Sequence, residues 1–140
     1  MLFRSSATVA NRVPVHATGP YTVPNARAAT RAVYTNNPPA GAFRGFGVPQ
    51  AAIAHEALMD ELAAKLGMDP LEFRHLNAIR AGEETATGQR LAASAGLAQC
   101  LEALRPRWRA AWAAAEQANL GPGRVKRGVG IGRASCRERV

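Results

Sequence analysis

The clearest hydrophobic pattern in the chain lies between Pro49 and Leu66. Apolar residues recur there at helical spacing, mostly four positions apart: Ile53, Ala57, Leu58, Leu62 and Leu66. This stripe predicts an amphipathic helix that turns these residues toward the core. Gly67 follows directly and suits the position that ends a helix, because glycine adopts a left-handed backbone without a Cβ penalty.

A second helix is predicted from Pro70 to about Ile79. The segment Asp69-Pro-Leu-Glu72 combines an N-cap aspartate, a first-turn proline and a glutamate at capping-box spacing. The following stretch, Arg80–Leu91, is polar and contains two glycines, so we expect a loop there.

The C-terminal third is also predicted to be helical. A helix should begin at Ser94 or Gly96 and run through Leu104. Proline has no amide hydrogen to donate, so Pro106 is expected to separate this helix from another at Arg107–Asn119.

The pattern is less regular elsewhere. Ser6–Ala17 is ambiguous and fits a short helix interrupted near Pro14, whereas Thr18–Asn25 is expected to be extended or turn-like. Arg27–Thr35 and Val125–Ile131 are each predicted to form a strand, from their β-branched residues or their alternation. The expected fold class is therefore α+β, with short strands followed by three or four helices.

One loop has the character of a binding site. Three glycines, Gly41, Gly45 and Gly47, bracket Phe43, Arg44 and Phe46, and the loop leads into a helix with Pro49 near its first turn. Glycine lets a backbone approach a ligand closely, and a helix N-terminus attracts anions. From the residues alone, a tight turn into the helix explains this glycine loop (residues 41–47) equally well.

Charge and cysteine content narrow the function classes. The formal net charge is +8, from 18 Lys+Arg against 10 Asp+Glu, but the arginines are scattered. A basic helical module that binds nucleic acid or a protein partner therefore stays only an alternative.

The two cysteines, Cys100 and Cys136, form no Cys-x-x-Cys pair, and no apolar run approaches the roughly 20 residues of a membrane span. We expect a cytoplasmic protein without membrane or nucleic-acid partners.

The histidines and tryptophans give no sign of chemistry. His55-Glu56 begins like a zinc-binding helix, but position 59 is Met59, so His55 is expected on a solvated face. No metal ligand is predicted among the protein side chains. Trp108 and Trp112 lie four apart and are expected to act as packing anchors.

The last nine residues, Gly132–Val140, match the translation of a common sequencing adapter. We interpret them as an artefact and expect the native sequence to continue past Ile131. Excluding their three arginines and one glutamate lowers the formal charge from +8 to +6.

Several motifs in order resemble one enzyme family. Gly41-Ala-Phe-Arg-Gly-Phe-Gly-Val-Pro-Gln50 is similar to the Ala-Phe-Arg-Gly-Phe-Gly-Gly-Pro-Gln signature of the molybdopterin-binding subunit in the xanthine dehydrogenase and aldehyde oxidase family. The resemblance continues in further segments: Gly19–Asn25, Glu56–Asp60, Leu66–Glu72, Asn77 and Thr87–Gln89. The tail, Leu104–Trp108 and Lys126–Gly130, most resembles the bacterial aldehyde oxidoreductases.

The resemblance implies a molybdenum-dependent oxidoreductase that oxidises aldehydes or hydroxylates a heterocycle with water. It implies a molybdopterin cofactor, in the cytosine dinucleotide form, and electron transfer to [2Fe-2S] clusters on a partner domain or subunit. By match to the motif, Phe43, Arg44 and Gly45 bind the cofactor, with the molybdenum near Arg44, and Phe46 contacts the substrate. One departure is Val48, where many members have glycine or alanine.

The family's other functional segments are absent from these residues. Its glutamate base and a second glycine-rich cofactor loop do not occur here, so no catalytic residue is assigned. Residues 1–131 are interpreted as a partial molybdopterin-binding domain, with the boundary of its two halves near 67–90. We expect such a fragment to expose apolar surface, to be poorly soluble and to be inactive alone, whereas the full-length form is expected to be an oligomer.

Overall fold

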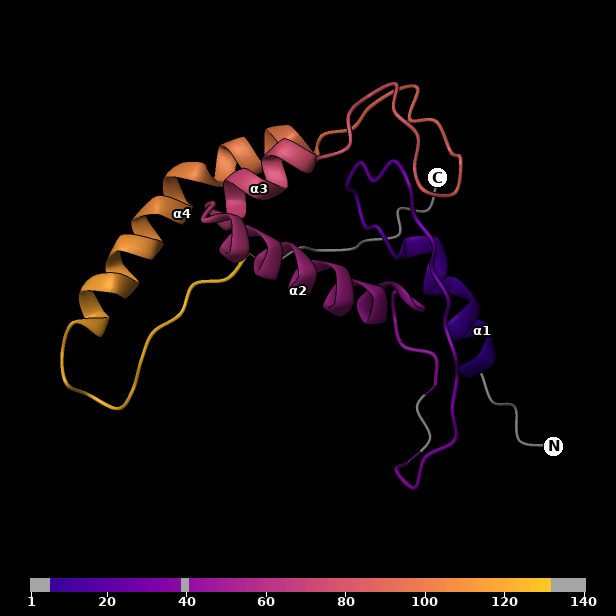
Figure 1. Ribbon diagram of the computed structural model, residues 1–140, viewed down its shortest axis with the longest axis horizontal. Coiled ribbons are helices and arrows are strands. Elements are labelled where there is room, and N and C mark those ends of the chain that lie inside the picture. Colours follow the sequence, from indigo (N-terminus) through magenta and orange to yellow (C-terminus); the bar gives the residue numbers. More distant parts are fainter. Residues whose placement is uncertain (1–5, 39–40, 132–140) are drawn as a thin grey trace.

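The computed structural model describes residues 6–38 and 41–131 (Figure 1). Within these residues the chain forms α1 (Ser6–Arg12), the 3-10 turn η1 (Pro14–His16), α2 (Val48–Leu66), α3 (Pro70–Asn77) and α4 (Leu97–Asn119). Long α2 crosses the middle of the molecule, with α1 near its start and α3 and α4 at its far end. The segment interpreted as adapter, 132–140, lies outside the described residues.

The predicted strands are not formed. Residues 27–35 and 125–131 carry no strand assignment, and the β pairing of the described residues consists of two isolated antiparallel bridges, Tyr21–Ala78 and Glu84–Arg90. A strand exists only through hydrogen bonds to a neighbouring strand, and neither segment pairs with one. Val33 and Tyr34 are 75% and 87% exposed. The helical part of the α+β expectation is confirmed, whereas the short strands are not.

Helix α2 has the predicted extent but buries a different face. The buried residues are Ala51, His55, Met59 and Ala63. The large members of the predicted stripe are exposed instead: Ile53, Leu58, Leu62 and Leu66. The partners decide which face is buried, because α3 and residues 19–21 pack against His55, Met59 and Ala63. Gly67 ends the helix as predicted, at φ 64°.

Helices α2, α3 and α4 enclose a small core. One cluster joins Tyr21 to Met59, Ala63 and Phe73, and a second joins Leu71 and Ala78 to Leu101 and Trp108. The burial of Trp108 confirms it as a packing anchor, while Trp112 is 40% exposed and lies 5.2 Å from it between ring centroids.

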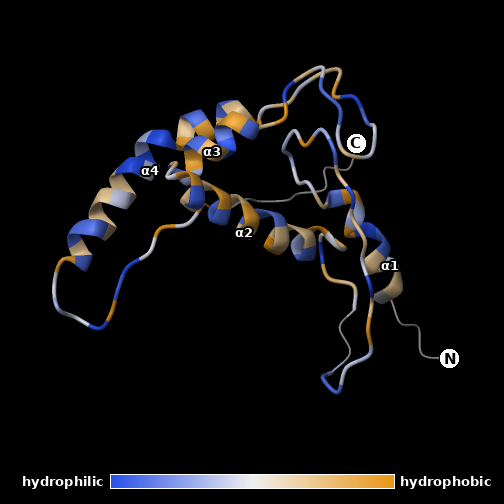
Figure 2. Ribbon diagram, in the orientation of Figure 1, coloured by the Kyte–Doolittle hydropathy of each residue, from blue (hydrophilic) through white to orange (hydrophobic). Residues whose placement is uncertain are grey.

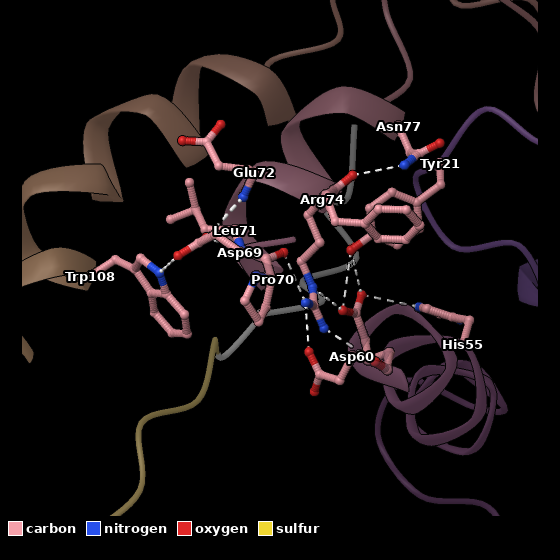
Figure 3. Close-up of polar contacts among 12 residues, drawn as sticks. Tyr21, His55, Asp60, Asp69, Pro70, Leu71, Glu72, Arg74, Asn77 and Trp108 are labelled. Carbon is pink, nitrogen blue, oxygen red and sulfur yellow. Dashed lines mark hydrogen bonds and ion pairs between the residues drawn. The ribbon is translucent and has the colours of Figure 1, made fainter. Parts of the chain in front are cut away.

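Asp69 joins the start of α3 to α4. Its Oδ1 accepts hydrogen bonds from the amides of Leu71 (2.7 Å) and Glu72 (3.1 Å), which confirms the predicted N-cap. Its Oδ2 accepts a third from the indole of Trp108 (2.8 Å), as Figure 3 shows.

Helix α4 runs continuously through Pro106, so the predicted break is wrong. An interior proline costs about 3 kcal/mol through its lost hydrogen bond and its ring clash. Contacts on both sides oppose that cost. Arg105 pairs with Glu72 of α3 and with Glu102 of α4, and Leu101 and Trp108 are buried before and after the proline. None of the described helices is long and apolar enough to cross a membrane.

Candidate functional site

The glycine loop turns sharply just before α2. Gly45, Phe46 and Gly47 have three consecutive positive φ angles of 96°, 47° and 98°. Phe46 is a non-glycine residue in the left-handed region, which is uncommon and concentrates at functional sites. The amide of Phe46 donates to the carbonyl of Phe43 (2.8 Å), and the amide of Val48 donates to that of Gly45 (3.1 Å). The loop is thus a compact turn that feeds directly into the N-terminus of α2.

Gly47 lies directly against α1. A Cβ on Gly47 would lie 2.9 Å from both the Cβ of Arg12 and the carbonyl oxygen of Val9, and 3.2 Å from the amide nitrogen of Val13. Gly45 is similarly enclosed, since a Cβ there would lie 2.8 Å from Cδ of Pro49. Any other residue at these two positions would therefore clash with its neighbours and would also have to adopt an unfavourable positive φ angle.

The four residues predicted to contact cofactor or substrate are consecutive on this turn. Phe43 is 66% exposed and Arg44 is exposed, whereas Gly45 and Phe46 are half-buried. The loop therefore presents Phe43 and Arg44 to the outside, while Gly47 is buried against α1.

The structure adds Arg12, which the sequence pattern did not single out. Arg12 ends α1 beside Gly47, and its Nε is buried without a hydrogen-bond partner. A buried donor left unpaired costs about 1–3 kcal/mol. No local signal could have identified Arg12, because 35 residues separate it from the glycine it contacts.

A polar clamp holds the centre of α2 to its neighbours (Figure 3). It consists of Tyr21, Glu56, Asp60 and Arg74. The Tyr21 hydroxyl donates to the Glu56 carboxylate (3.0 and 3.1 Å). Arg74 donates from Nε to Glu56 (2.8 Å) and from Nη1 to Asp60 (2.7 Å). Burial lowers the pKa of Arg74, but the hydrogen bonds that it donates to Asp60 and Glu56, together with their negative charges, outweigh burial and raise the pKa above its ordinary value.

His55 is buried beside this clamp, which corrects the predicted solvated face. It is 6% exposed, its Nε2 lies 3.4 Å from Oε1 of Glu56, and its ring meets that of Tyr21 edge-on at 6.2 Å. Gly19 sits so close that a Cβ would approach the His55 ring to 2.6 Å. The helix pattern could not show this burial, because the covering residues lie more than 30 positions away. Across the described residues, no cluster of three or more His, Cys, Asp or Glu side chains could hold a metal ion.

Comparison with known proteins identifies the family of the chain. Residues 2–78 match the family described as the molybdopterin cofactor-binding domain. The chain is 56% identical over 97 residues to the nicotinate dehydrogenase large molybdopterin subunit of Eubacterium barkeri, covering 69% of this chain and 23% of that protein. It is 45% identical over 111 residues to the aldehyde oxidoreductase of Megalodesulfovibrio gigas, covering 79% and 12%.

A solved structure gives the same result in three dimensions. The aldehyde oxidoreductase from Desulfovibrio gigas superposes with a TM-score of 0.72 at 41% sequence identity, over 80% of this chain and 12% of that one. The chain thus spans less than a quarter of the length of these relatives. The matched residues include α1, the glycine loop, α2 and α3. The chain belongs to the molybdopterin cofactor-binding domain family.

Proposed function

We propose that this chain supplies one cofactor loop of a molybdenum hydroxylase large subunit. The whole subunit would oxidise an aldehyde or hydroxylate a heterocycle, with oxygen from water. The observation that carries the proposal is the turn of three positive φ angles at Gly45, Phe46 and Gly47 in a chain of this family.

The residues at the loop fit a bound molybdopterin. The glycines permit the tight turn that ends at the N-terminus of α2, and a helix N-terminus favours an anionic group. Beside them, the unpartnered Nε of Arg12 offers a further donor at the base of the loop. If ligand binding shifted the side chains that cover Arg12, its Nε could donate to an acceptor on the ligand. That hydrogen bond would remove the free-energy cost of burying the donor unpaired.

Each loop residue then has a role that suits its chemistry. Phe43, Arg44 and Gly45 would hold the cofactor, with the molybdenum near Arg44, and Phe46 would present an aromatic wall that orients a flat substrate. The bound cofactor would supply the two-electron oxidation. The protein residues bind, orient and exclude water; the glutamate that acts as base in the family is assigned to none of these residues.

A heterocyclic substrate has specific support beside the aldehyde. The Eubacterium barkeri relative at 56% identity is named a nicotinate dehydrogenase. Nicotinate carries a carboxylate on an aromatic ring, which would suit an arginine and a phenylalanine on one loop. Arg44 and Phe46 provide that pair here.

Further features belong to the same proposal. The cofactor would be the cytosine dinucleotide form, and electrons would leave to [2Fe-2S] clusters on a partner domain or subunit of a cytoplasmic oligomer. The proposed boundary between the domain halves at 67–90 coincides with the end of α2, short α3 and the loop at 80–91, and the family match ends at residue 78.

Grafting tests this function. Residues 6–131 would replace the matching segment of the Megalodesulfovibrio gigas aldehyde oxidoreductase, and kcat/KM would be measured with an aromatic aldehyde and with nicotinate. In this graft, Phe46→Ala should lower kcat/KM at least about tenfold with the molybdenum content unchanged. Trp112→Ala, an exposed aromatic on α4, is the control and should change neither. Equal kcat/KM for the Phe46→Ala and parent grafts would remove Phe46 from the substrate site.

A further inference from the structure

One segment lies along the N-terminal half of α2 and contacts it at both ends. We call residues 9–21 the strap. At one end, the backbone of Val9 and Val13 abuts Gly47, and at the other, Gly19 abuts the ring of His55. Between them, η1 packs on α2. The strap therefore spans the same stretch of helix that begins at the glycine loop.

The strap is fastened by Tyr21. Its hydroxyl donates to Glu56, which Arg74 holds in turn from α3. The backbone on either side of Tyr21 is also tied to the end of α3: Thr22 donates to Asn77 (2.9 Å), and Ile79 donates to Pro20 (3.0 Å). Because Glu56 sits on α2, the hydroxyl bond joins the strap directly to the helix that carries the loop.

We infer that Tyr21 and Glu56 are positioning residues for the glycine loop. The bonds from Phe46 to Phe43 and from Val48 to Gly45 are local, so they fix the shape of the turn at residues 43–48 but not its place. Its place relative to Arg12 depends on how the strap lies on α2. The Tyr21–Glu56 hydrogen bond holds the strap against α2. In this way it keeps Arg12 in contact with Gly47, although neither of these two residues touches the clamp.

Hydrogen–deuterium exchange of Tyr21→Phe tests this role, because the substitution removes only the hydroxyl. The exchange is measured at a dilution at which sedimentation velocity shows both proteins to be monomeric. The amides of Phe46, Val48 and Ala51, which donate to acceptors within the loop, should exchange roughly tenfold faster than in the parent. The only α4 residue among those packed on the Tyr21 cluster is Leu97, at the start of the helix, so amides beyond Trp108 in α4 should keep their rates.

Asp60→Asn is the matched control. The Asp60 side chain also bonds Arg74, but it is 63% exposed and its bond leads to α3 and not to the strap, so the loop amides should stay protected in this variant. The inference is overturned if Tyr21→Phe leaves the loop amides unchanged, or if it speeds α4 equally, which would mean a general loss of stability.

This inference rests on the proposed function only in taking the glycine loop as the cofactor site. The exchange experiment uses no cofactor, so the two can fail separately. Faster loop exchange in Tyr21→Phe together with a graft that binds no molybdenum would keep the positioning role and reject the cofactor role.

Discussion

At the scale of single residues, Arg74 shows how one buried charge is accommodated. Arg74 is 2% exposed, and its side chain donates to the Glu56 carboxylate, the Asp60 carboxylate, the carbonyl of Pro70 (3.2 Å) and that of Glu56 (3.1 Å). A buried guanidinium is tolerated only when its donors are satisfied in this way.

Arg74→Met should therefore lower the free energy of unfolding by about 3–5 kcal/mol, because it leaves the half-buried Glu56 carboxylate without its cation. Urea denaturation measures the change. Arg109→Met, at an exposed position on α4, should stay within about 0.5 kcal/mol of the parent. Equal losses for the two variants would contradict the importance of the clamp.

Residues with local signals were predicted correctly, and residues with distant partners were not. Gly67 and Asp69 end and begin helices through their own backbone and side chain, so their neighbours in sequence revealed them. Arg12, His55 and Arg74 owe their surroundings to residues 35, 36 and 18 positions away, at Gly47, Gly19 and Glu56 respectively. No periodicity within one helix carries that information.

At the scale of elements, the loop between α3 and α4 is held by a carboxylate. Glu83 accepts hydrogen bonds from the hydroxyl of Thr22 (2.6 Å) and the amide of Arg80 (2.7 Å), and these bonds lower its pKa. Within the loop, Thr85 donates to Gln89 and Leu91 donates to Glu83 (both 2.9 Å), forming a short hairpin.

This loop should loosen in acid. Because the pKa of Glu83 is lower in the folded chain, its contribution to stability is complete above the ordinary value of 4.5 and is lost as the pH falls through the lowered one. Limited proteolysis at residues 80–91 should therefore accelerate below about pH 4. Glu83→Gln should cleave faster already at pH 7 and respond less to acid. The same pH response in both proteins would show that another group controls the loop.

The element predictions failed where a partner decides the outcome. Pro106 was expected to break α4, but buried Leu101 and Trp108 and the Arg105–Glu72 pair hold both sides of the helix in place. Residues 27–35 have strand propensity but lie beside no second strand, so no ladder forms.

At the scale of the whole molecule, much apolar surface faces solvent. Figure 2 shows hydrophobic residues along the length of α2, and Ile53, Leu58 and Leu66 are 75%, 56% and 62% exposed. A helix that is apolar on most of its faces is typical of a protein interior. The expected exposure of apolar surface is confirmed. The two relatives are each at least four times longer than the segment that matches this chain, so in them further residues are available to cover such a surface.

The chain should therefore self-associate as its concentration rises. Replacing Leu58 and Leu62, neighbours one turn apart on α2, by glutamate should weaken this association at least about tenfold. Sedimentation velocity over a concentration series measures it. Leu120→Glu, which changes a residue 77% exposed beyond the end of α4, is the control. A parent chain that stays monomeric at high concentration would contradict this account.

If the glycine loop binds molybdopterin, the molybdenum content of the graft should depend on the shape of this loop. Gly47→Ala and Gly82→Ala both place a side chain at positive φ (98° and 88°), but only the alanine at 47 would collide with α1, since position 82 faces open space. We predict close to one molybdenum per subunit in the parent graft and in Gly82→Ala, and several-fold less in Gly47→Ala. A folded parent graft without molybdenum, or equal content in the two variants, would contradict the claim.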